Sequence, residues 1–359
     1  MEKKIIRVGM VGTGMIFDRH CRGIKASPDA EVTAICDVSR EALKKKAMLN
    51  GIPESNTFTD YTEMMDSGLV DAIVICTPND SHVPIALEAI KRGLPFAMEK
   101  PVGLNVEEVR MLNDKVRETK IKNTVLFTYR FKASARYAKH IVDSGVIGKI
   151  YHVNTEYYQD YDLRPFSLPT FWRFQKGVAG GGVVFDLGSH VMDLVTFITG
   201  LDYESICATA ENLINTRPDP ITGELREVNT DDYCHMMARF TSGASGVFAI
   251  SKCCMGRKNY QRIQIYGSKG VIVYTLTDKN LEDTIEVCIG EPYVDSYDYT
   301  KLDIPKEYFA EQMQAFIDVI NDCGDGLTAN MEDGLRAQEL IEKVYESSDT
   351  HSWVDVRRN

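Results

Sequence analysis

The chain has 359 residues, which is too long for one ordinary domain core and about right for two. Its formal net charge of -11 argues against nucleic acid as the main partner, because affinity for a phosphate backbone comes from clustered lysine and arginine. Apolar residues make up 44% of the chain without an apolar run approaching the roughly 18 residues of a membrane span, so we expect a soluble protein and no membrane partner.

The start of the chain and its cysteines bear on the compartment. Met1 to Arg7 are charged and lead into an apolar strand pattern, without the apolar core and cleavage site of a secretory signal. The nine cysteines are scattered, odd in number and never spaced as Cys-x-x-Cys, which indicates reduced thiols and no metal site. We therefore expect a cytoplasmic protein.

Residues 1–128 alternate short apolar runs with amphipathic stretches, which is typical of βαβ units around a parallel sheet. The predicted strands are Ile5 to Val11, Val32 to Cys36, Ala72 to Cys76, Phe96 to Met98 and Val125 to Phe127. The predicted helices are Met15 to Lys25, Arg40 to Asn50, Tyr61 to Ser67, Val83 to Arg92 and Val106 to Thr119. Apolar strands of this kind predict a doubly wound domain with helices on both faces.

The first strand runs into a glycine turn of the kind that binds dinucleotides. Gly12 and Gly14 lie where strand becomes helix, with Met15 and Ile16 directly after them, so backbone N–H groups and the helix N-terminus can approach a pyrophosphate. Phe17 stands where the fingerprint has its third glycine. Taken alone, the motif is also compatible with an ordinary glycine turn.

The end of the second strand favours NAD as the dinucleotide. Asp37 stands there, where a carboxylate can bind both ribose hydroxyls and would repel a 2′-phosphate. The alternative is that Asp37 is a helix cap. Arg40 follows three residues later and could stack on adenine or approach a 2′-phosphate, so NADP is disfavoured rather than excluded.

Two further strands end in candidate site residues. Thr77, Pro78, Asn79 and His82 follow the strand that ends at Cys76, at the edge where ligands of open α/β sheets bind, although this segment could equally cap the next helix. Glu99, Lys100 and Pro101 follow the strand that ends at Met98. We expect Glu99 to lie at the cofactor and the Lys100 ammonium to orient a substrate hydroxyl and to ease its deprotonation.

Residues 129–359 have longer β-rich segments with Gly, Asp and Asn turns, which predict an antiparallel or mixed sheet. The strands expected are Ile150 to Tyr158, Ile206 to Ile214, Tyr233 to Phe240, Ser245 to Lys252, Arg262 to Tyr266 and Val271 to Thr275. The helices expected are Val183 to Thr199, Glu307 to Asp322 and Asp333 to Ser347, of which the last two could pack back on the first domain.

A glycine run, Gly180 to Gly182, precedes a helix with a polar stripe. Asp186, His190 and Asp193 are spaced to share one helix face. We interpret His190 as the general base for a hydroxyl proton, and Asp186 as a group that binds a substrate hydroxyl and helps to orient the imidazole. The alternative is a buried structural pair, against which the glycines count because they let backbone crowd a ligand.

The segment from Tyr157 to Phe174 is rich in aromatic residues. Tyr158 and Trp172 offer ring faces for sugar C–H edges, and Arg164 offers donors for hydroxyls. Interface or domain-closing packing is an alternative interpretation.

Together, the glycine turn before Asp37, the Glu99-Lys100-Pro101 strand end and the segment from Gly180 to Asp193 resemble the Gfo/Idh/MocA oxidoreductases. The resemblance extends to the tract Gly334 to Ala337, so it covers nearly the whole chain.

This resemblance implies an N-terminal Rossmann domain and a C-terminal open, mostly antiparallel sheet that carries the substrate site and a homo-oligomer interface, in a dimer or tetramer. It implies that Lys100, Asp186 and His190 are catalytic and that the Lys100-Pro101 peptide is cis. It also implies that Tyr129, Arg130, Trp172 and Arg173 line the substrate pocket, although Thr128 and Tyr129 differ from the commoner Asn-containing pattern.

Three functions follow. The first is hydride transfer from a ring secondary alcohol of a sugar, glycoside or cyclitol such as inositol to NAD. The second is a redox-neutral enzyme with tightly held NAD that oxidises a glycoside transiently or passes hydride between two sugars. The third is a non-catalytic nucleotide sensor, against which the retention of Lys100, Asp186 and His190 argues.

Overall fold

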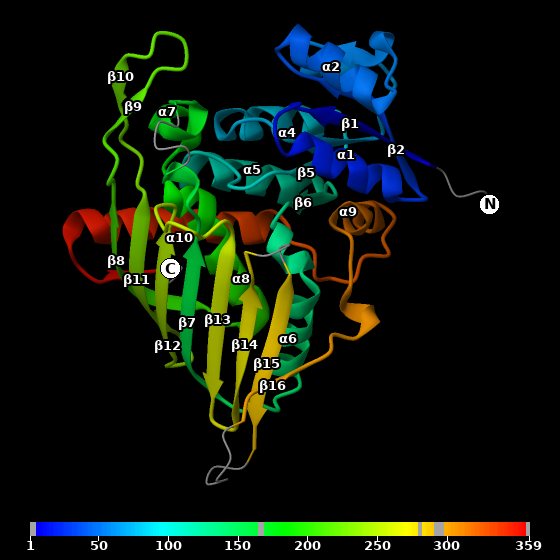
Figure 1. The fold of residues 1–359 in the computed structure, drawn as a ribbon. Helices are drawn as coiled ribbons and strands as arrows, with labels where there is room; N and C mark the ends of the chain where they lie inside the picture. The colour runs from blue at the N-terminus through cyan, green and yellow to red at the C-terminus, as the bar shows by residue number, and fades with distance from the viewer. Residues whose placement is uncertain (1–4, 164–168, 279–281, 291–297, 357–359) are drawn as a thin grey trace. The chain divides into compact units, whose positions relative to one another are not determined.

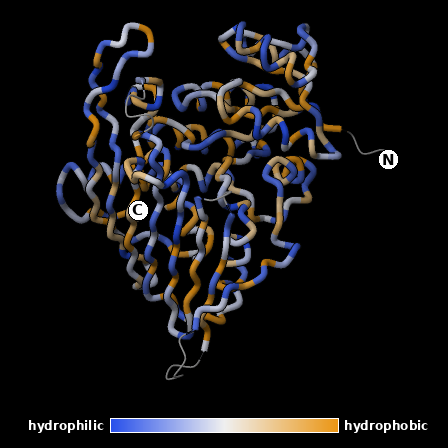
Figure 2. The backbone as a smooth tube through the Cα atoms, in the orientation of Figure 1, coloured by the Kyte–Doolittle hydropathy of each residue, from blue (hydrophilic) through white to orange (hydrophobic). Residues whose placement is uncertain are grey.

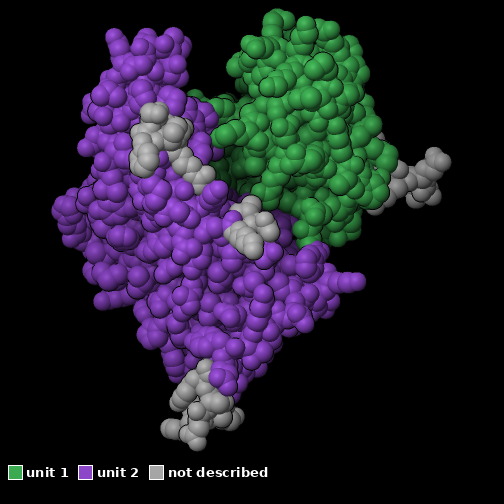
Figure 3. Space-filling view, viewed as in Figure 1, with its two compact units in different colours: residues 1–127, 310–338 green, residues 128–309, 339–359 purple. Residues whose placement is uncertain are grey.

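A computed structural model describes residues 5–163, 169–278, 282–290 and 298–356. The chain folds into two compact units, residues 1–127 with 310–338 and residues 128–309 with 339–359 (Figure 3). Residues 310–338 are counted with the first unit, because Met313, Phe316 and Ile317 join its core. The sequence interpretation assigned them to the second domain and expected that the C-terminal helices could pack back on the first.

The first unit is a doubly wound parallel sheet, as predicted. Over its described residues the strand order is β3-β2-β1-β4-β5-β6. The strands are β1 (Ile6–Val11), β2 (Ala30–Cys36), β3 (Thr57–Phe58), β4 (Ala72–Ile75), β5 (Phe96–Met98) and β6 (Asn123–Val125). The helices are α1 (Phe17–Ala26), α2 (Arg40–Asn50), α3 (Tyr61–Asp66), α4 (His82–Lys91), α5 (Val106–Thr119) and α9 (Gln312–Ile320).

The strands β1, β2, β4 and β5 divide their side chains between two cores. In β4, Ile73 and Ile75 pack with α4 and α5, whereas Ala72 and Val74 pack with α1 and α9. This alternation explains why the strand is apolar throughout. β1 pairs with both β2 and β4, so the glycine turn after Val11 lies at the point where the strand order reverses.

The second unit is built on a mixed, mostly antiparallel sheet, which also confirms the prediction. Its described strands have the order β16-β15-β14-β13-β7-β12-β11-β8-β17 (Figure 1). The central strands are β7 (Ile150–Tyr158), β8 (Tyr203–Glu211), β11 (Tyr233–Phe240), β12 (Ser245–Ser251), β13 (Tyr260–Gly267) and β14 (Gly270–Leu276). The shorter or outer ones are β9 (Thr216–Pro218), β10 (Leu225–Glu227), β15 (Asp283–Ile289), β16 (Thr300–Lys301) and β17 (Val354–Asp355). β7 and β12 pair in parallel.

One face of this mixed sheet is covered by helices. They are α6 (Ala133–Asp143), α8 (Ser189–Thr199) and part of α10 (Met331–Thr350), and a short helix, α7 (Lys176–Ala179), precedes the glycine run. Hydrophobic and hydrophilic residues both occur along the strands (Figure 2), and in β11 buried and exposed side chains alternate. The residues of β11 that point away from the helices, such as Met237, are exposed.

Several predicted elements need correction. The helix expected from Val183 is α-helical only from Ser189, because Val184–Gly188 form a π-helical segment. The tract from Glu307 begins with a 3₁₀ turn, Lys306–Tyr308, and becomes helical only at Gln312. The strand expected at 206–214 starts at Tyr203 and ends at Glu211, and β6 ends at Val125.

One helical stretch contradicts the expectation that no segment approaches a membrane span. Among the described residues, Lys176–Thr199 is long and apolar enough by length and composition, but 89% of the tested window is buried inside the protein. A core helix passes the same test. The packing of α8 against α6 and the mixed sheet accounts for its apolar character.

Candidate active site in two half-sites

The glycine turn has the geometry that a dinucleotide requires. Gly12 has a φ of 90°, and a Cβ atom there would lie 2.7 Å from the backbone carbonyl of Cys76, so only glycine fits. A Cβ on Gly14 would meet no atom within 4 Å, which leaves open space beside the start of α1. The Phe17 ring, in place of the third glycine, is buried in the core. The turn therefore fits a bound pyrophosphate.

Asp37 is fixed to this turn from the end of β2. Its Oδ2 accepts hydrogen bonds from the backbone N–H and the hydroxyl of Thr13, both at 2.7 Å, and its Oδ1 accepts one from Ser39 N at 2.9 Å. Ser39, not Asp37, caps the following helix, because its side chain accepts from Ala42 N. Arg40 is exposed as the first residue of α2. The carboxylate thus stands beside the turn where ribose hydroxyls would bind.

The loop after β4 is connected to the loop after β5 by the side chain of His82. The ring contacts the carbonyl oxygen of Pro101 through Nδ1 and that of Thr77 through Nε2, both at 2.9 Å. Asn79 is buried and begins a 3₁₀ turn. Burial lowers the pKa of His82, while the two carbonyls and the charge of Glu99 oppose that shift. His82 therefore joins the loops after β4 and β5, and both its nitrogens are used by backbone.

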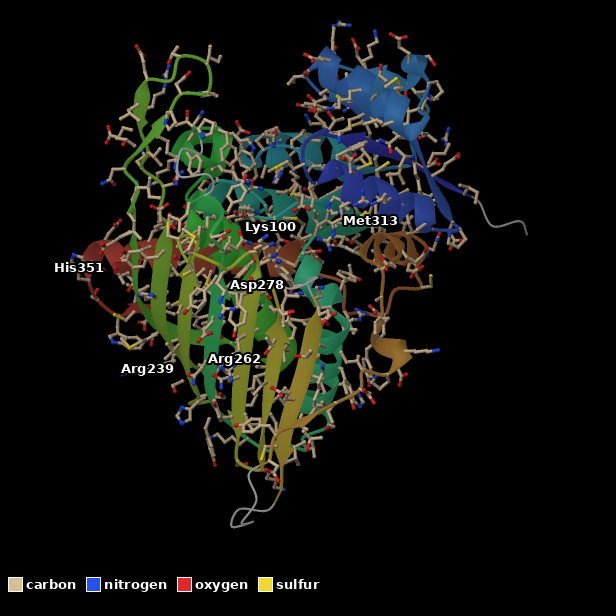
Figure 4. The ribbon with its side chains drawn as sticks, in the orientation of Figure 1. Lys100, Arg239, Arg262, Asp278, Met313 and His351 are labelled. Carbon is tan, nitrogen blue, oxygen red and sulfur yellow. The ribbon has the colours of Figure 1, made fainter. Side chains whose placement is uncertain are left out.

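Lys100 follows β5 (labelled in Figure 4), and its peptide bond to Pro101 is cis, as the resemblance implied. Glu99 accepts a hydrogen bond from His20 Nε2 at 2.6 Å and one from the Lys100 backbone N–H at 3.2 Å. Burial alone would raise the pKa of Glu99, but the His20 hydrogen bond and the charges of His20, Lys100 and His82 lower it below its ordinary value. Glu99 is therefore a carboxylate at neutral pH.

The second half-site lies around the start of α8. His190 occupies the first turn of this helix, and its ring meets that of Tyr129 edge-on, with centroids 4.7 Å apart. The Tyr129 hydroxyl is 2.7 Å from that of Tyr157 and 3.0 Å from Asn259 Oδ1. Tyr157 is fully buried, which raises its pKa well above the ordinary value. This network fixes the surface on which the imidazole rests.

Asp186 lies in the π-helical segment, and two cations hold its carboxylate. Lys252 Nζ is 3.0 Å from Oδ2, and Arg173 Nη1 is 3.3 Å from Oδ1. The Arg173 guanidinium also stacks on the Trp172 ring, 4.4 Å from its centroid. Asp186 therefore lies in the π-helical segment, whereas His190 and Asp193 lie on the regular helix α8 that follows it.

Asp193, the third member of that stripe, belongs to a buried ion pair. Arg130 donates from Nε and Nη2 to its two carboxylate oxygens, at 2.8 and 2.5 Å. Both side chains are more than nine-tenths buried. Arg130, which the resemblance placed at the pocket, therefore neutralises Asp193 inside the second unit.

The glycine run has a packing role that the sequence interpretation missed. A Cβ on Gly182 would lie 2.0 Å from the backbone oxygen of Asp231, and Cβ atoms on Gly180 and Gly181 would collide with the Phe185 ring. The Asp231 carboxylate accepts hydrogen bonds from Gly182 N and Val184 N, both at 2.8 Å. These glycines let Asp231 anchor the start of the helix, so their contacts are with protein.

The aromatic segment is described in part. Tyr158 stacks on Tyr260, with centroids 6.4 Å apart, and the Phe171 ring lies edge-on to Trp172 and Phe174. Arg164 lies outside the described residues. Within the described residues no group of three or more His, Cys, Asp or Glu side chains is placed to hold a metal ion, and each of the nine cysteines has a free thiol.

Sequence reasoning missed Lys252 and His20. Lys252 directly follows β12, and it is as buried as a core residue. Its strand-end position, the same signal that singled out Lys100, could have found it. His20 lies on α1 where an amphipathic helix would place a core residue. The structure alone reveals that its partner is Glu99.

Comparisons with known proteins find matches to both units of the chain. Residues 6–127 match the oxidoreductase family with an NAD-binding Rossmann fold, and residues 135–273 match the GFO/IDH/MocA C-terminal domain. Levoglucosan dehydrogenase of Pseudarthrobacter phenanthrenivorans is 26% identical over 390 residues, covering 98% of each chain. Inositol 2-dehydrogenase of Rhizobium meliloti is 27% identical over 347 residues, covering 95% of this chain and 96% of its own.

Solved structures of levoglucosan dehydrogenase have the same fold as this chain. A structure of levoglucosan dehydrogenase in complex with NADH and levoglucosan aligns with a TM-score of 0.89 at 26% identity, covering 99% of this chain and 100% of that chain. Its complex with NADH and L-sorbose aligns equally well, with a TM-score of 0.89.

Proposed function

Because the chain belongs to the Gfo/Idh/MocA family of NAD-binding oxidoreductases, we propose that it oxidises a ring secondary alcohol of a sugar, glycoside or cyclitol, with Lys100, Asp186 and His190 as catalytic residues. Two named relatives, a levoglucosan and an inositol dehydrogenase, act on substrates of this chemistry. Both match along nearly the whole chain.

Bound NAD supplies the hydride acceptor. Gly12 and Gly14 let the backbone approach the pyrophosphate, and the Asp37 carboxylate, already fixed by Thr13, accepts hydrogen bonds from ribose hydroxyls. The same negative charge repels a 2′-phosphate. The residues around the glycine turn therefore favour NAD over NADP.

The chain's own residues handle the hydroxyl and its proton. The Lys100 ammonium donates a hydrogen bond to the substrate oxygen and stabilises the negative charge that develops on it. The Asp186 carboxylate accepts a hydrogen bond from a substrate hydroxyl, and the His190 imidazole takes the proton of the reacting one. The carbinol then becomes a ketone, with one hydride and one proton removed.

The observation that carries this proposal is the place of Lys100. Lys100 directly follows β5, and β5 pairs with β4. The backbone that directly follows β4, at Cys76 and Thr77, is in close contact with Gly12 of the glycine turn. A lysine in this position lies at the carboxyl ends of the parallel strands, where an open α/β fold binds its ligand. The fixed carboxylate of Glu99 directly before it orders this segment.

Substitution of His190 by alanine tests the proposal. We expect His190→Ala to lose on the order of a hundredfold or more in turnover, because general bases contribute about 10²–10⁴-fold. Its affinity for NADH should stay unchanged. The assay follows NADH absorbance with a panel of polyols, pyranoses, O-glycosides and C-glycosides.

His351→Ala, at an exposed histidine (labelled in Figure 4), is the matched control and should keep full turnover. Equal turnover of His190→Ala and the wild type would remove the imidazole from the mechanism. NADH absorbance in the purified protein without added cofactor, together with turnover that needs none, would instead indicate the redox-neutral reaction.

We also propose that the protein is a homo-oligomer that associates through the uncovered face of the mixed sheet. Met237 of β11 and Val247 of β12 are paired neighbours on that face, and each is about half exposed, at 49% and 51%. Exposed apolar neighbours in a sheet centre are typical of an interface. Light scattering should give at least twice the monomer mass of 40.4 kDa, and Met237→Glu should lower it.

A further inference from the structure

We propose that Lys252 is a positioning residue of the substrate half-site, which keeps the Asp186 carboxylate ionised and oriented as a hydrogen-bond acceptor for a substrate hydroxyl. This inference rests on the proposed function. It adds a residue from the mixed sheet that the glycine-turn and strand-end motifs do not include.

The backbone of Lys252 fixes where its ammonium can reach. The residue directly follows β12, and its N–H donates to the Asp232 carbonyl at 3.0 Å. Its Nζ then lies 3.0 Å from Asp186 Oδ2. The side chain is 4% exposed, whereas that of Asp186 is 21% exposed. The lysine therefore contacts the carboxylate from the protein interior, while the Asp186 side chain stays partly exposed to solvent.

Each cation pairs with a different oxygen of the Asp186 carboxylate. Lys252 is paired with Oδ2 and Arg173 with Oδ1, at 3.0 and 3.3 Å. A carboxylate has about four acceptor positions on its two oxygens, so it can accept from cations and from a substrate hydroxyl at the same time. A protonated carboxyl group would instead present an O–H donor on one oxygen. Two cations therefore select the form that can accept a hydroxyl hydrogen bond.

Lys252 stays charged in spite of its burial. Burial lowers the pKa of the ammonium, but the Asp186 and Asp162 carboxyls raise it further, so the net shift is upward. Burial raises the pKa of Asp162 to about 7, so this second carboxyl is only partly ionised at neutral pH. Asp186 is consequently the principal counter-ion of Lys252.

The other groups around this pair come from several elements of the second unit. Tyr157 of β7 and Tyr161 of the next turn both respond to the charge of Asp186, and burial raises both of their pKa values. The charged or titratable neighbours are Arg173, Asp162 with its own partners Asp232 and Arg217, and His190 on the following turn of helix. Lys252 and Arg173 are both cations in direct contact with Asp186.

The test compares Lys252→Met with Lys252→Arg. An opposite charge in contact lowers a carboxyl pKa by about 1–3 units, so we expect Lys252→Met to move the acid limb of the kcat/KM profile upward by about one pH unit or more. Its kcat/KM at neutral pH should fall about tenfold or more, with NADH affinity unchanged. Lys252→Arg should keep the acid limb of the wild type. Lys258→Met, at an exposed lysine nearby, is the matched control.

Two results would overturn the inference. One is a Lys252→Met profile that overlies the wild type, and the other is an equal loss at every pH with no shift of the limb, as a purely structural lysine would give. If Lys252→Met does not fold, Lys252→Gln against Lys252→Arg gives the same comparison with a polar side chain in place. Far-UV circular dichroism checks the fold of each variant.

A readout without turnover separates this inference from the proposed function. The infrared difference spectrum of Lys252→Met minus wild type, recorded at pH values through the acid limb of the profile, should show a protonated-carboxyl band that is absent when Asp186→Asn is added. If the band appears and no substrate of the panel reacts, the proposed function fails and the role of Lys252 toward Asp186 stands. If Asp186→Asn abolishes turnover and the band is missing, the inference on Lys252 alone fails.

Discussion

Glu99 in the first unit and Asp186 in the second are both carboxylates of the proposed half-sites with similar exposure, 15% and 21%, yet they are held in different ways. Glu99 bonds to an imidazole, His20, and to the backbone of the residue it precedes. Asp186 is held by a lysine and an arginine. Imidazole is the partner that can lose its charge near neutral pH, whereas lysine and arginine keep theirs.

This difference fits what each carboxylate does. Glu99 orders a backbone segment, and for that task a hydrogen bond matters more than a fixed charge. Asp186 is proposed to meet a substrate hydroxyl directly, so its ionisation has to survive changes of pH and of bound ligand. A carboxylate that only supports structure can depend on one donor, whereas one that binds substrate gains from two permanent cations.

The largest expected effect concerns a third carboxylate, Asp193, which is buried more deeply than either. Arg130→Met should destabilise the protein by about 3–5 kcal/mol, because removal of one partner leaves an uncompensated buried charge. Urea unfolding at pH 7 measures this loss. If the cost scales with burial as the comparison requires, Arg173→Met, beside the more exposed Asp186, should cost clearly less.

A double variant separates the charge from the packing. Arg130→Met combined with Asp193→Leu replaces the pair by apolar side chains, which is often neutral for buried pairs, so most of the lost stability should return. An equal loss in the single and the double variant would show that Arg130 acts through its shape, for example by its contact with Phe197, whose ring centroid is 5.1 Å from the guanidinium.

The two units differ in how far the sequence predicts their site residues, not in how far it predicts their elements. The predicted ends of β5, α2 and α5 in the first unit and of β7 and β11 in the second match the structure to the residue, because each is a local pattern. The two-residue strand β3 is too short to give a pattern. The glycine turn, Asp37 and Lys100 were found because each lies directly at a strand end.

The second unit depends on contacts that no local pattern encodes. β7 pairs in parallel with β12, and this crossover brings the end of β12, and with it Lys252, into the unit's polar cluster. Asp231 caps a helix start about fifty residues earlier in the chain, so its role is visible only in three dimensions. The spacing of Asp186 and His190 assumes a regular α-helix, and the π-helical segment that contains Asp186 could not be foreseen from it.

A smaller effect, on the pH dependence of stability, tests the contrast between the imidazole partner of Glu99 and the two cations at Asp186. In the wild type the pKa of Glu99 lies below its ordinary value of 4.5, so its ionised form stabilises the fold above about pH 4.5, and this contribution is lost as the pH falls through the lowered value. His20→Leu removes two of the influences that lower this pKa and leaves burial, the largest one, which raises it. We expect the sign to reverse in the variant.

With a raised pKa, Glu99 in His20→Leu stabilises the fold only while it is protonated, and that contribution disappears as the pH rises from about 4.5 through the raised value. The deficit of His20→Leu against the wild type should therefore be about 1–3 kcal/mol larger at pH 7 than at pH 4.5, as one pKa unit corresponds to about 1.4 kcal/mol. Urea midpoints at both pH values measure it. His20→Leu with Glu99→Gln is the control, because an amide cannot ionise and its deficit should not change with pH. Parallel stability curves for His20→Leu and the wild type would mean that Lys100 and His82 alone keep Glu99 ionised, and the contrast between a single imidazole and paired cations would then no longer hold.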